Sequence, residues 1–202
     1  YRRMGESAKG LDVAQRGLEI FSGIDVPQGV IFAHAVLGPL FWRQGRPVKA
    51  RGHLTKAQEL IREHEAKQFS NSVERWLAQV YLAEGDVDLA ASKLQVLRSS
   101  SSRALGTEAE SVERLWAEVL AVRNRRAEAI QVLEKSLDRM NEETEPYQIA
   151  LTQVALVQIL TQAKGAESEA QNYAESAQQT FEQLGAHPDE QKATELLAHL
   201  NR

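Results

Sequence analysis

The chain contains no cysteine. The side chains that we consider first for chemistry are therefore its histidines, carboxylates and arginines. The five histidines do not combine with acidic residues at the spacing of a metal-binding helix. The sequence also lacks a glycine-rich phosphate loop, a Gly-x-Ser-x-Gly elbow and a thiol nucleophile. We therefore expect no metal site, no cofactor and no catalytic centre, so the chain is not expected to be an enzyme.

Arginine offers the clearest binding chemistry, since a guanidinium can hold a carboxylate or phosphate through two parallel hydrogen bonds. Arg123, Arg125 and Arg126 form one basic cluster, which we interpret as an exposed turn rather than a phosphate site. The net charge of −4 also lacks the basic footprint of a nucleic-acid binder. We expect no direct nucleic-acid partner.

No apolar stretch reaches the roughly 18 residues that a membrane-spanning helix needs. The longest such run, 29–42, is interrupted by His34, Gly38 and Pro39. No signal-peptide pattern opens the chain, which begins at Tyr1. The sequence therefore predicts a cytoplasmic protein without a membrane partner, and we interpret the chain as a fragment of a longer protein.

The elements that must position these side chains are helices, because Ala, Leu, Glu and Gln dominate the sequence. One helical pattern recurs: a small residue, then an apolar residue four positions later, then usually another small residue three further on. Residues three, four and seven apart share one helix face, and small residues there let two backbones approach closely. The first members are 40, 39 and 41 residues apart: Ala50, Ala90, Ala129 and Ala170.

A second helical pattern precedes each of these, 13 or 14 residues earlier. Short polar turns at 44–47, 84–86, 123–125 and 163–165 separate the two helices, and short connections make neighbouring helices antiparallel. The clearest copy reads Leu37-Gly38-x-x-Phe41, a turn, and Ala50-x-x-x-Leu54-x-x-Ala57.

This arrangement resembles the tetratricopeptide (TPR) repeat. The resemblance covers nearly the whole chain, although the period near 40 exceeds the usual 34 of that family. It implies an all-α fold in which antiparallel helical hairpins stack into a right-handed α-solenoid. A HEAT-type array has a similar period and is the second interpretation, because its pattern fits the glycine turn and small residues less well.

The resemblance predicts one TPR-like array over residues 1–202. It begins with a half repeat at 5–22 and ends with a capping helix at 189–200, which carries Ala193, Leu196, Leu197 and Leu200 on one side. Between them lie four hairpins, at 27–64, 70–99, 107–140 and 146–184.

The resemblance also implies that the first helix of each pair lines a concave groove. The residues carried over to that groove include Trp42, Arg43, Arg75, Gln79, Arg114, Glu118 and Gln158. Arg75 and Arg114 occupy the same position in adjacent repeats, where they could hold a partner's carboxylate; two solvated arginines are the alternative. Pro39, inside a helix, is expected to kink it.

The function that follows is a non-catalytic scaffold that binds a peptide, a helix or a partner domain in the groove. Self-association is a further expectation, through an uncapped first helix whose Leu11, Leu18 and Phe21 need cover. The long repeats and the ending 180–188 resemble the TPR arrays of large bacterial regulators, of the MalT-like or signalling-ATPase type. That resemblance implies an alternative, in which the domain senses a small-molecule effector for a transcriptional regulator.

Overall fold

The computed structural model describes residues 7–100, 107–140, 145–162 and 166–200. Every regular element in these ranges is a helix, so the all-α fold predicted from the sequence is confirmed. The chain divides into two compact units, unit 1 (residues 1–100) and unit 2 (residues 101–202). Each unit is a stack of antiparallel helices, and whether the two form one continuous array stays a prediction.

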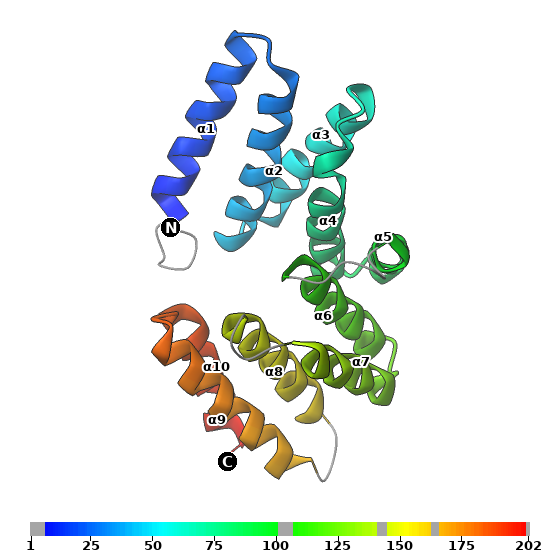
Figure 1. Cartoon of the computed structure of the whole chain (residues 1–202), viewed down its shortest axis with the longest axis vertical. Coiled ribbons are helices and arrows are strands. Elements are labelled where there is room, and N and C mark those ends of the chain that lie inside the picture. Colours follow the sequence, from blue (N-terminus) through cyan, green and yellow to red (C-terminus); the bar gives the residue numbers. More distant parts are fainter. Residues whose placement is uncertain (1–6, 101–106, 141–144, 163–165, 201–202) are drawn as a thin grey trace. The chain divides into compact units, whose positions relative to one another are not determined.

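The described residues of unit 1 form five α-helices and one short 3₁₀ helix (Figure 1). Helix α1 packs on α2, α2 pairs with α3, and α4 pairs with α5, while α4 also contacts both helices of the preceding hairpin. The elements are α1 (Ser7–Gly23), α2 (Pro27–Arg43), α3 (Pro47–Glu63), η1 (Lys67–Phe69), α4 (Ser70–Glu84) and α5 (Val87–Ser100).

The described residues of unit 2 form two hairpins followed by a single helix, whereas in unit 1 the single helix comes first. The hairpins are α6 with α7 and α8 with α9, and the last helix packs mainly on α9. The elements are α6 (Thr107–Val122), α7 (Arg126–Arg139), α8 (Pro146–Leu160), α9 (Glu167–Gln183) and α10 (His187–Leu200). The turn expected at 163–165 lies outside the described residues.

The turns end helices in one repeated way. In unit 1 the carbonyls of Phe21, Phe41, Ile61 and Tyr81, spaced by twenty residues, each accept a hydrogen bond from the backbone N–H five residues later, at 2.9–3.0 Å. This is the bond of the Schellman motif, which requires a left-handed residue inside the loop. Gly45 and Gly85 supply it with φ of 68° and 86°, and Asn124 does so in unit 2 with φ of 61°.

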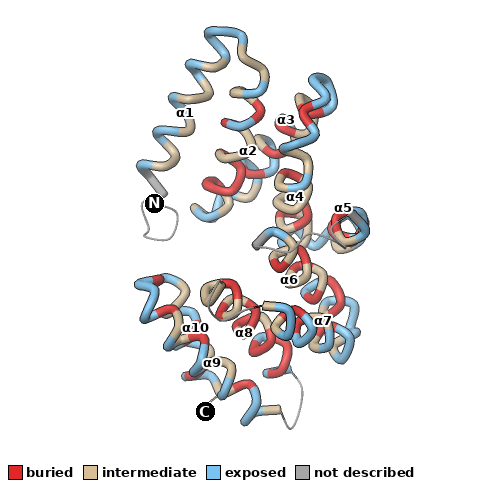
Figure 2. Tube along the Cα trace, viewed as in Figure 1, coloured by how far each residue is buried: buried red, intermediate tan, exposed pale blue. Residues whose placement is uncertain are grey.

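The core of each unit lies between paired helices and is built by the repeated small and apolar residues (Figure 2). The small residues that define the repeat, Ala50, Ala90, Ala129 and Ala170, are all completely buried. At Gly38 an added Cβ would lie 2.5 Å from the Cγ of Leu54, so only glycine allows α2 and α3 to approach this closely.

Pro39 in α2 and the apolar residues of α1 are the two places where the sequence predicts a kink or an uncovered surface. Helix α2 runs without interruption through the buried Pro39, from Pro27 to Arg43. On α1, Leu11 and Leu18 are already partly buried against the core of unit 1, and the ring of Phe21 lies against Gly29 of α2. The three residues expected to need cover from another molecule are therefore covered, at least in part, by α2.

Helix α10 buries the side that the sequence pattern marks as apolar. Ala193 and Leu197 are buried, and Leu196 and Leu200 pack partly buried against the core of unit 2. No helix within the described ranges is both long enough and apolar enough to cross a membrane.

Candidate functional site

The candidate binding surface is the face formed by the first helices of the pairs. In unit 1 these helices are α2 and α4, which contact each other directly; in unit 2 they are α6, α8 and α10, and α8 contacts both of the others. We call these surfaces the first-helix face of each unit. Residues at equal positions of successive first helices are brought next to one another along such a face.

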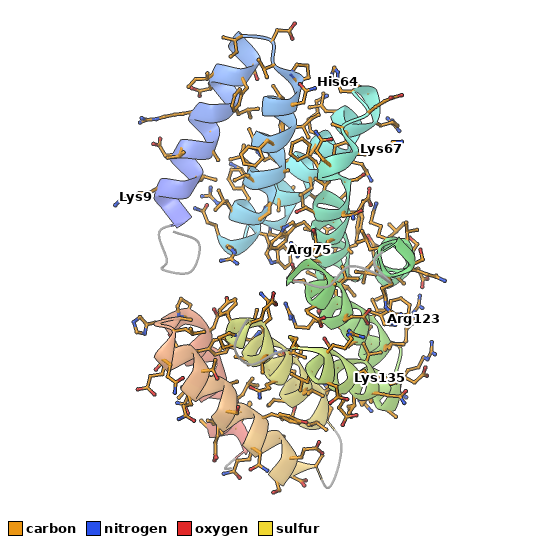
Figure 3. The ribbon with its side chains drawn as sticks, in the orientation of Figure 1. Lys9, His64, Lys67, Arg75, Arg123 and Lys135 are labelled. Carbon is orange, nitrogen blue, oxygen red and sulfur yellow. The ribbon has the colours of Figure 1, made fainter. Side chains whose placement is uncertain are left out.

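The first-helix face of unit 1 carries four of the predicted groove residues. Trp42 is half-buried and packs against the core of unit 1, while Arg43 beside it is exposed. Arg75 is half-buried, with its guanidinium carbon 4.4 Å from the ring centre of Trp76, a cation–π contact. Gln79 is half-buried one turn further along α4 (Figure 3 labels Arg75).

In unit 2 the structure uses Arg114 to join two first helices. Its guanidinium donates hydrogen bonds to Gln148 Oε1 at 2.7 Å and Thr152 Oγ1 at 3.1 Å, both on α8, and to Ser111 Oγ at 3.0 Å on α6. Thr152 is completely buried and Gln148 nearly so. These bonds satisfy polar groups that would otherwise be costly to bury, so Arg114 has a structural role between repeats.

Glu118 and Gln158 occupy equal positions on α6 and α8 and are both exposed on the first-helix face of unit 2. Desolvation raises the pKa of the Glu118 carboxyl, while the positive charge of Lys192 on α10 opposes the rise. Charged groups from α6 and α10 therefore act on one another across this face.

In the basic cluster at 123–126, Arg125 and Arg126 are hydrogen-bonded to neighbouring side chains. The Arg125 guanidinium donates two hydrogen bonds, each 2.6 Å long, to the carboxylate of Glu128. The resulting attraction raises the pKa of Arg125 and lowers that of Glu128. Arg126 donates to Gln162 Oε1 at 3.4 Å. These contacts fit the interpretation of an exposed turn.

Sequence reasoning missed a pair of histidines on the two helices of the first hairpin. His34 on α2 and His53 on α3 face each other with their Nδ1 atoms 2.9 Å apart. Burial, then the neighbouring His53, then Lys56 lower the pKa of His34 to about 4. Burial and Lys49 likewise lower the pKa of His53. Both imidazoles are thus held neutral, so that one ring can donate to the other.

The histidine pair could have been predicted from the repeat, by comparing residues at equal positions of the first two hairpins. In the next hairpin Lys93 donates to Glu74 at 2.6 Å, and these residues are also 19 apart, at the same two repeat positions. The first hairpin therefore replaces an ion pair by a histidine pair. The two histidines can be located by comparing polar residues at equal positions of successive repeats. A search for residues three or four apart on one helix does not find them.

A shallow recess of about 400 Å³ lies in unit 1 where α3, η1 and α4 meet. Most of its lining residues are polar, and they include both acidic and basic side chains. The lining consists of Gln58, Ile61, Arg62, Glu65, Lys67, Ser70 and Glu74. Gln58 and Lys93 both donate to the carboxylate of Glu74, so that carboxylate is already engaged. Arg62 and Lys67 are exposed at the rim (Figure 3 labels Lys67).

The described residues contain no cluster of three or more His, Asp or Glu side chains arranged to hold a metal ion. No family model matches the sequence, and no curated protein matches it.

Solved structures with the same fold are TPR-like repeat proteins. A putative kinesin light chain from Podosopora anserina with nearly identical TPR-like repeats is similar, with a TM-score of 0.60 and 16% identity over 87% of each chain. BtubC (BKLC) from P. vanneervenii is similar with a TM-score of 0.59 and 18% identity, over 100% of this chain and 89% of that one. The class that these likenesses define is an all-helical, TPR-like solenoid, in agreement with the sequence.

Proposed function

We propose that this protein is a non-catalytic scaffold that binds another protein through its first-helix faces. The observation that carries the proposal is the pair Glu118 and Gln158, exposed at equal positions of successive helices in a TPR-like solenoid. Such spacing presents polar groups at regular intervals, which suits an extended peptide or a helix laid across the repeats.

Arg114 has a smaller part in this proposal than the sequence assigned to it. Its donors already serve Gln148, Thr152 and Ser111. A substitution there would disturb the packing of α6 on α8 as well as any partner contact. Arg43, Glu118 and Gln158, which are exposed, are the better probes of binding.

The proposal is tested by partner capture with two matched double variants. Glu118→Arg/Gln158→Glu changes the first-helix face of unit 2, and Glu182→Arg/Gln183→Glu makes the same charge changes on exposed residues of α9. Proteins bound by the tagged wild-type chain are quantified by mass spectrometry after equal melting temperatures are verified. Loss of a partner in the first variant alone is expected, whereas equal capture by all three proteins would reject this binding surface.

The recess at the α3–α4 corner favours a second candidate function, the sensing of a small effector. Its volume falls within the range of known ligand pockets, and Arg62 and Lys67 at its rim would suit an anionic group. A thermal-shift screen with sugars and anionic metabolites, repeated on Arg62→Ala/Lys67→Ala, tests it. An effector must raise the melting temperature of the wild type and not of the variant; the lack of any such compound rejects the idea.

The same proposal places the chain in a longer, cytoplasmic bacterial regulator, of the MalT-like or signalling-ATPase type. This placement rests on the long repeat period and the ending 180–188. The solved structures named above are similar in fold only, because the identities are 16% and 18%.

A further inference from the structure

Helix α5 carries a row of uncharged residues on its outer side. Four residues spaced by three, four and three positions share this side of the helix: Leu89, Ser92, Val96 and Ser99. We call them the α5 stripe. Leu89 and Val96 are 51% and 68% exposed, and both serines are exposed as well. Large apolar and small residues therefore alternate along the surface of unit 1.

The other second helices carry exposed polar residues where α5 carries Leu89 and Val96. The position of Leu89 holds Lys9, Lys49, Glu128 and Glu169, and that of Val96 holds Arg16, Lys56, Lys135 and Ser176 (Figure 3 labels Lys135). In both units a further hairpin packs behind such a helix, on α3 and on α7, and yet these positions stay exposed. The next hairpin of a stack therefore does not cover this side. Apolar residues at positions that the repeat leaves open to solvent indicate a contact surface.

The polar groups in and beside the α5 stripe are engaged within unit 1. The hydroxyls of Ser92 and Ser99 donate to the backbone carbonyls of Leu89 and Val96, each at 2.8 Å. Lys93, at the edge of the stripe, is paired with a carboxylate of α4 at 2.6 Å. Among the exposed α5 residues that the structure describes, only the one before Leu89 is charged. A partner that covers the stripe must therefore bring an uncharged and largely apolar surface.

The α5 stripe is complementary to itself when two copies of α5 lie antiparallel. Residues 89 and 99 are centred on position 94, and so are residues 92 and 96. A two-fold axis at the level of Leu94 therefore sets Leu89 of each chain against Ser99 of the other, and Val96 against Ser92. Each large side chain then meets a small one, as close packing of two helices requires. A parallel pairing would instead set large against large and small against small.

We propose that the α5 stripe is a homodimerisation surface, on which a second copy of this chain lies antiparallel about a two-fold axis at Leu94. In this register all four residues of one stripe meet the stripe of the other copy, so the two apolar rows coincide. The contact of one helix pair is smaller than the roughly 1,200 Å² of a stable interface, so the dimer is weak. The surface lies on a second helix, apart from the first-helix faces, and it differs from α1, where the sequence predicts self-association. The inference does not depend on the proposed function.

Sedimentation velocity of the full chain, from low micromolar to millimolar concentrations, tests the surface. The wild type is expected to shift from monomer to dimer as concentration rises, and Val96→Glu is expected to stay a monomer. Val48→Glu is the matched control, because Val48 on α3 is 70% exposed and lies outside the stripe, and this variant should dimerise like the wild type. Equal melting temperatures verify that the variants fold. A wild type that is monomeric throughout, or a dimer that survives Val96→Glu, overturns the proposal.

Disulfide cross-linking tests the antiparallel register, and the absence of natural cysteines makes it specific. Leu89→Cys and Ser99→Cys are prepared as separate variants with tags of different size, and each is oxidised alone and in an equimolar mixture. In the proposed register residue 89 of one chain lies opposite residue 99 of the other, whereas two copies of residue 89 are ten positions apart, about 15 Å along the helix. The mixture should therefore give a disulfide-linked heterodimer, and neither variant alone should cross-link. Cross-linking of each variant with itself, or none in the mixture, overturns the antiparallel pairing.

Discussion

Replacing the histidine pair of the first hairpin by the ion pair of the second should remove an acid sensitivity. The change is His34→Glu/His53→Lys, which copies Glu74 and Lys93 at equal repeat positions. In the wild type all the groups that shift these histidines electrostatically, His53, Lys49 and Lys56, are bases, so protonation of either ring would be unfavourable. The Glu–Lys pair, by contrast, stays ionised in mild acid.

The magnitude follows from the two pKa values of His34, 6.5 in the unfolded chain and about 4 in the fold. Because the folded pKa is lowered, the unfolded chain binds more protons between these values, and stability falls as pH falls from about 7 towards 4. At about pH 5.5 the ideal loss is ~1.4 kcal/mol. Solvent reaches the half-buried ring and screens its charge, so we expect a loss of about 1 kcal/mol from His34. The lowered pKa of His53 adds a loss in the same direction.

The assay is urea unfolding followed by circular dichroism at about pH 7.5 and pH 5.5. The wild type should lose about 1 kcal/mol more between these pH values than the variant does. His64→Gln is the control, because His64 is an exposed histidine just past the end of α3 (Figure 3) and this variant should behave as the wild type. An equal loss in the wild type and the Glu–Lys variant would refute the reasoning.

Three further predictions concern contacts in the two hairpin stacks. Gly38→Ala should lower the free energy of unfolding by about 1–3 kcal/mol in urea titrations, because its Cβ would overlap Leu54; an unchanged midpoint would mean that α2 and α3 can separate freely. Arg114→Met should cost about 1–3 kcal/mol in the same assay, since Thr152 and its neighbours lose a donor, and a neutral result would remove its structural role. Lys192→Met should raise the pKa of the Glu118 carboxyl in an NMR titration, because it removes the charge that lowers this pKa; an unchanged pKa would show that the two groups do not interact.

The fold could be predicted because small residues recur at a regular spacing along the sequence. Ala50, Ala90, Ala129 and Ala170 are spaced by about 40 residues, and burial of each is what close helix packing requires. The left-handed turns at Gly45 and Gly85 could be predicted for a similar reason, since few other residues adopt that backbone.

The candidate site could be predicted only as a set of positions. The position of Arg114 was given by the repeat, but its hydrogen bonds to Gln148 and Thr152 depend on how α6 packs against α8, which the sequence does not encode locally. His34 and His53 escaped notice because they meet across a hairpin, not along one helix. Side-chain partners between helices are set by tertiary packing, whereas the periodicity reports on single helices.

The pairing of helices also sets how this chain can fold and change in length. Among the described helices, those in contact are always first or second neighbours along the sequence. The loops that must close are therefore short, which favours rapid folding through local contacts and lets order spread from one hairpin to the next. If a whole hairpin were duplicated or deleted, only its interfaces with the hairpin before it and the hairpin after it would have to change. Lengthening or shortening by complete hairpins is thus the change in size that this architecture tolerates best.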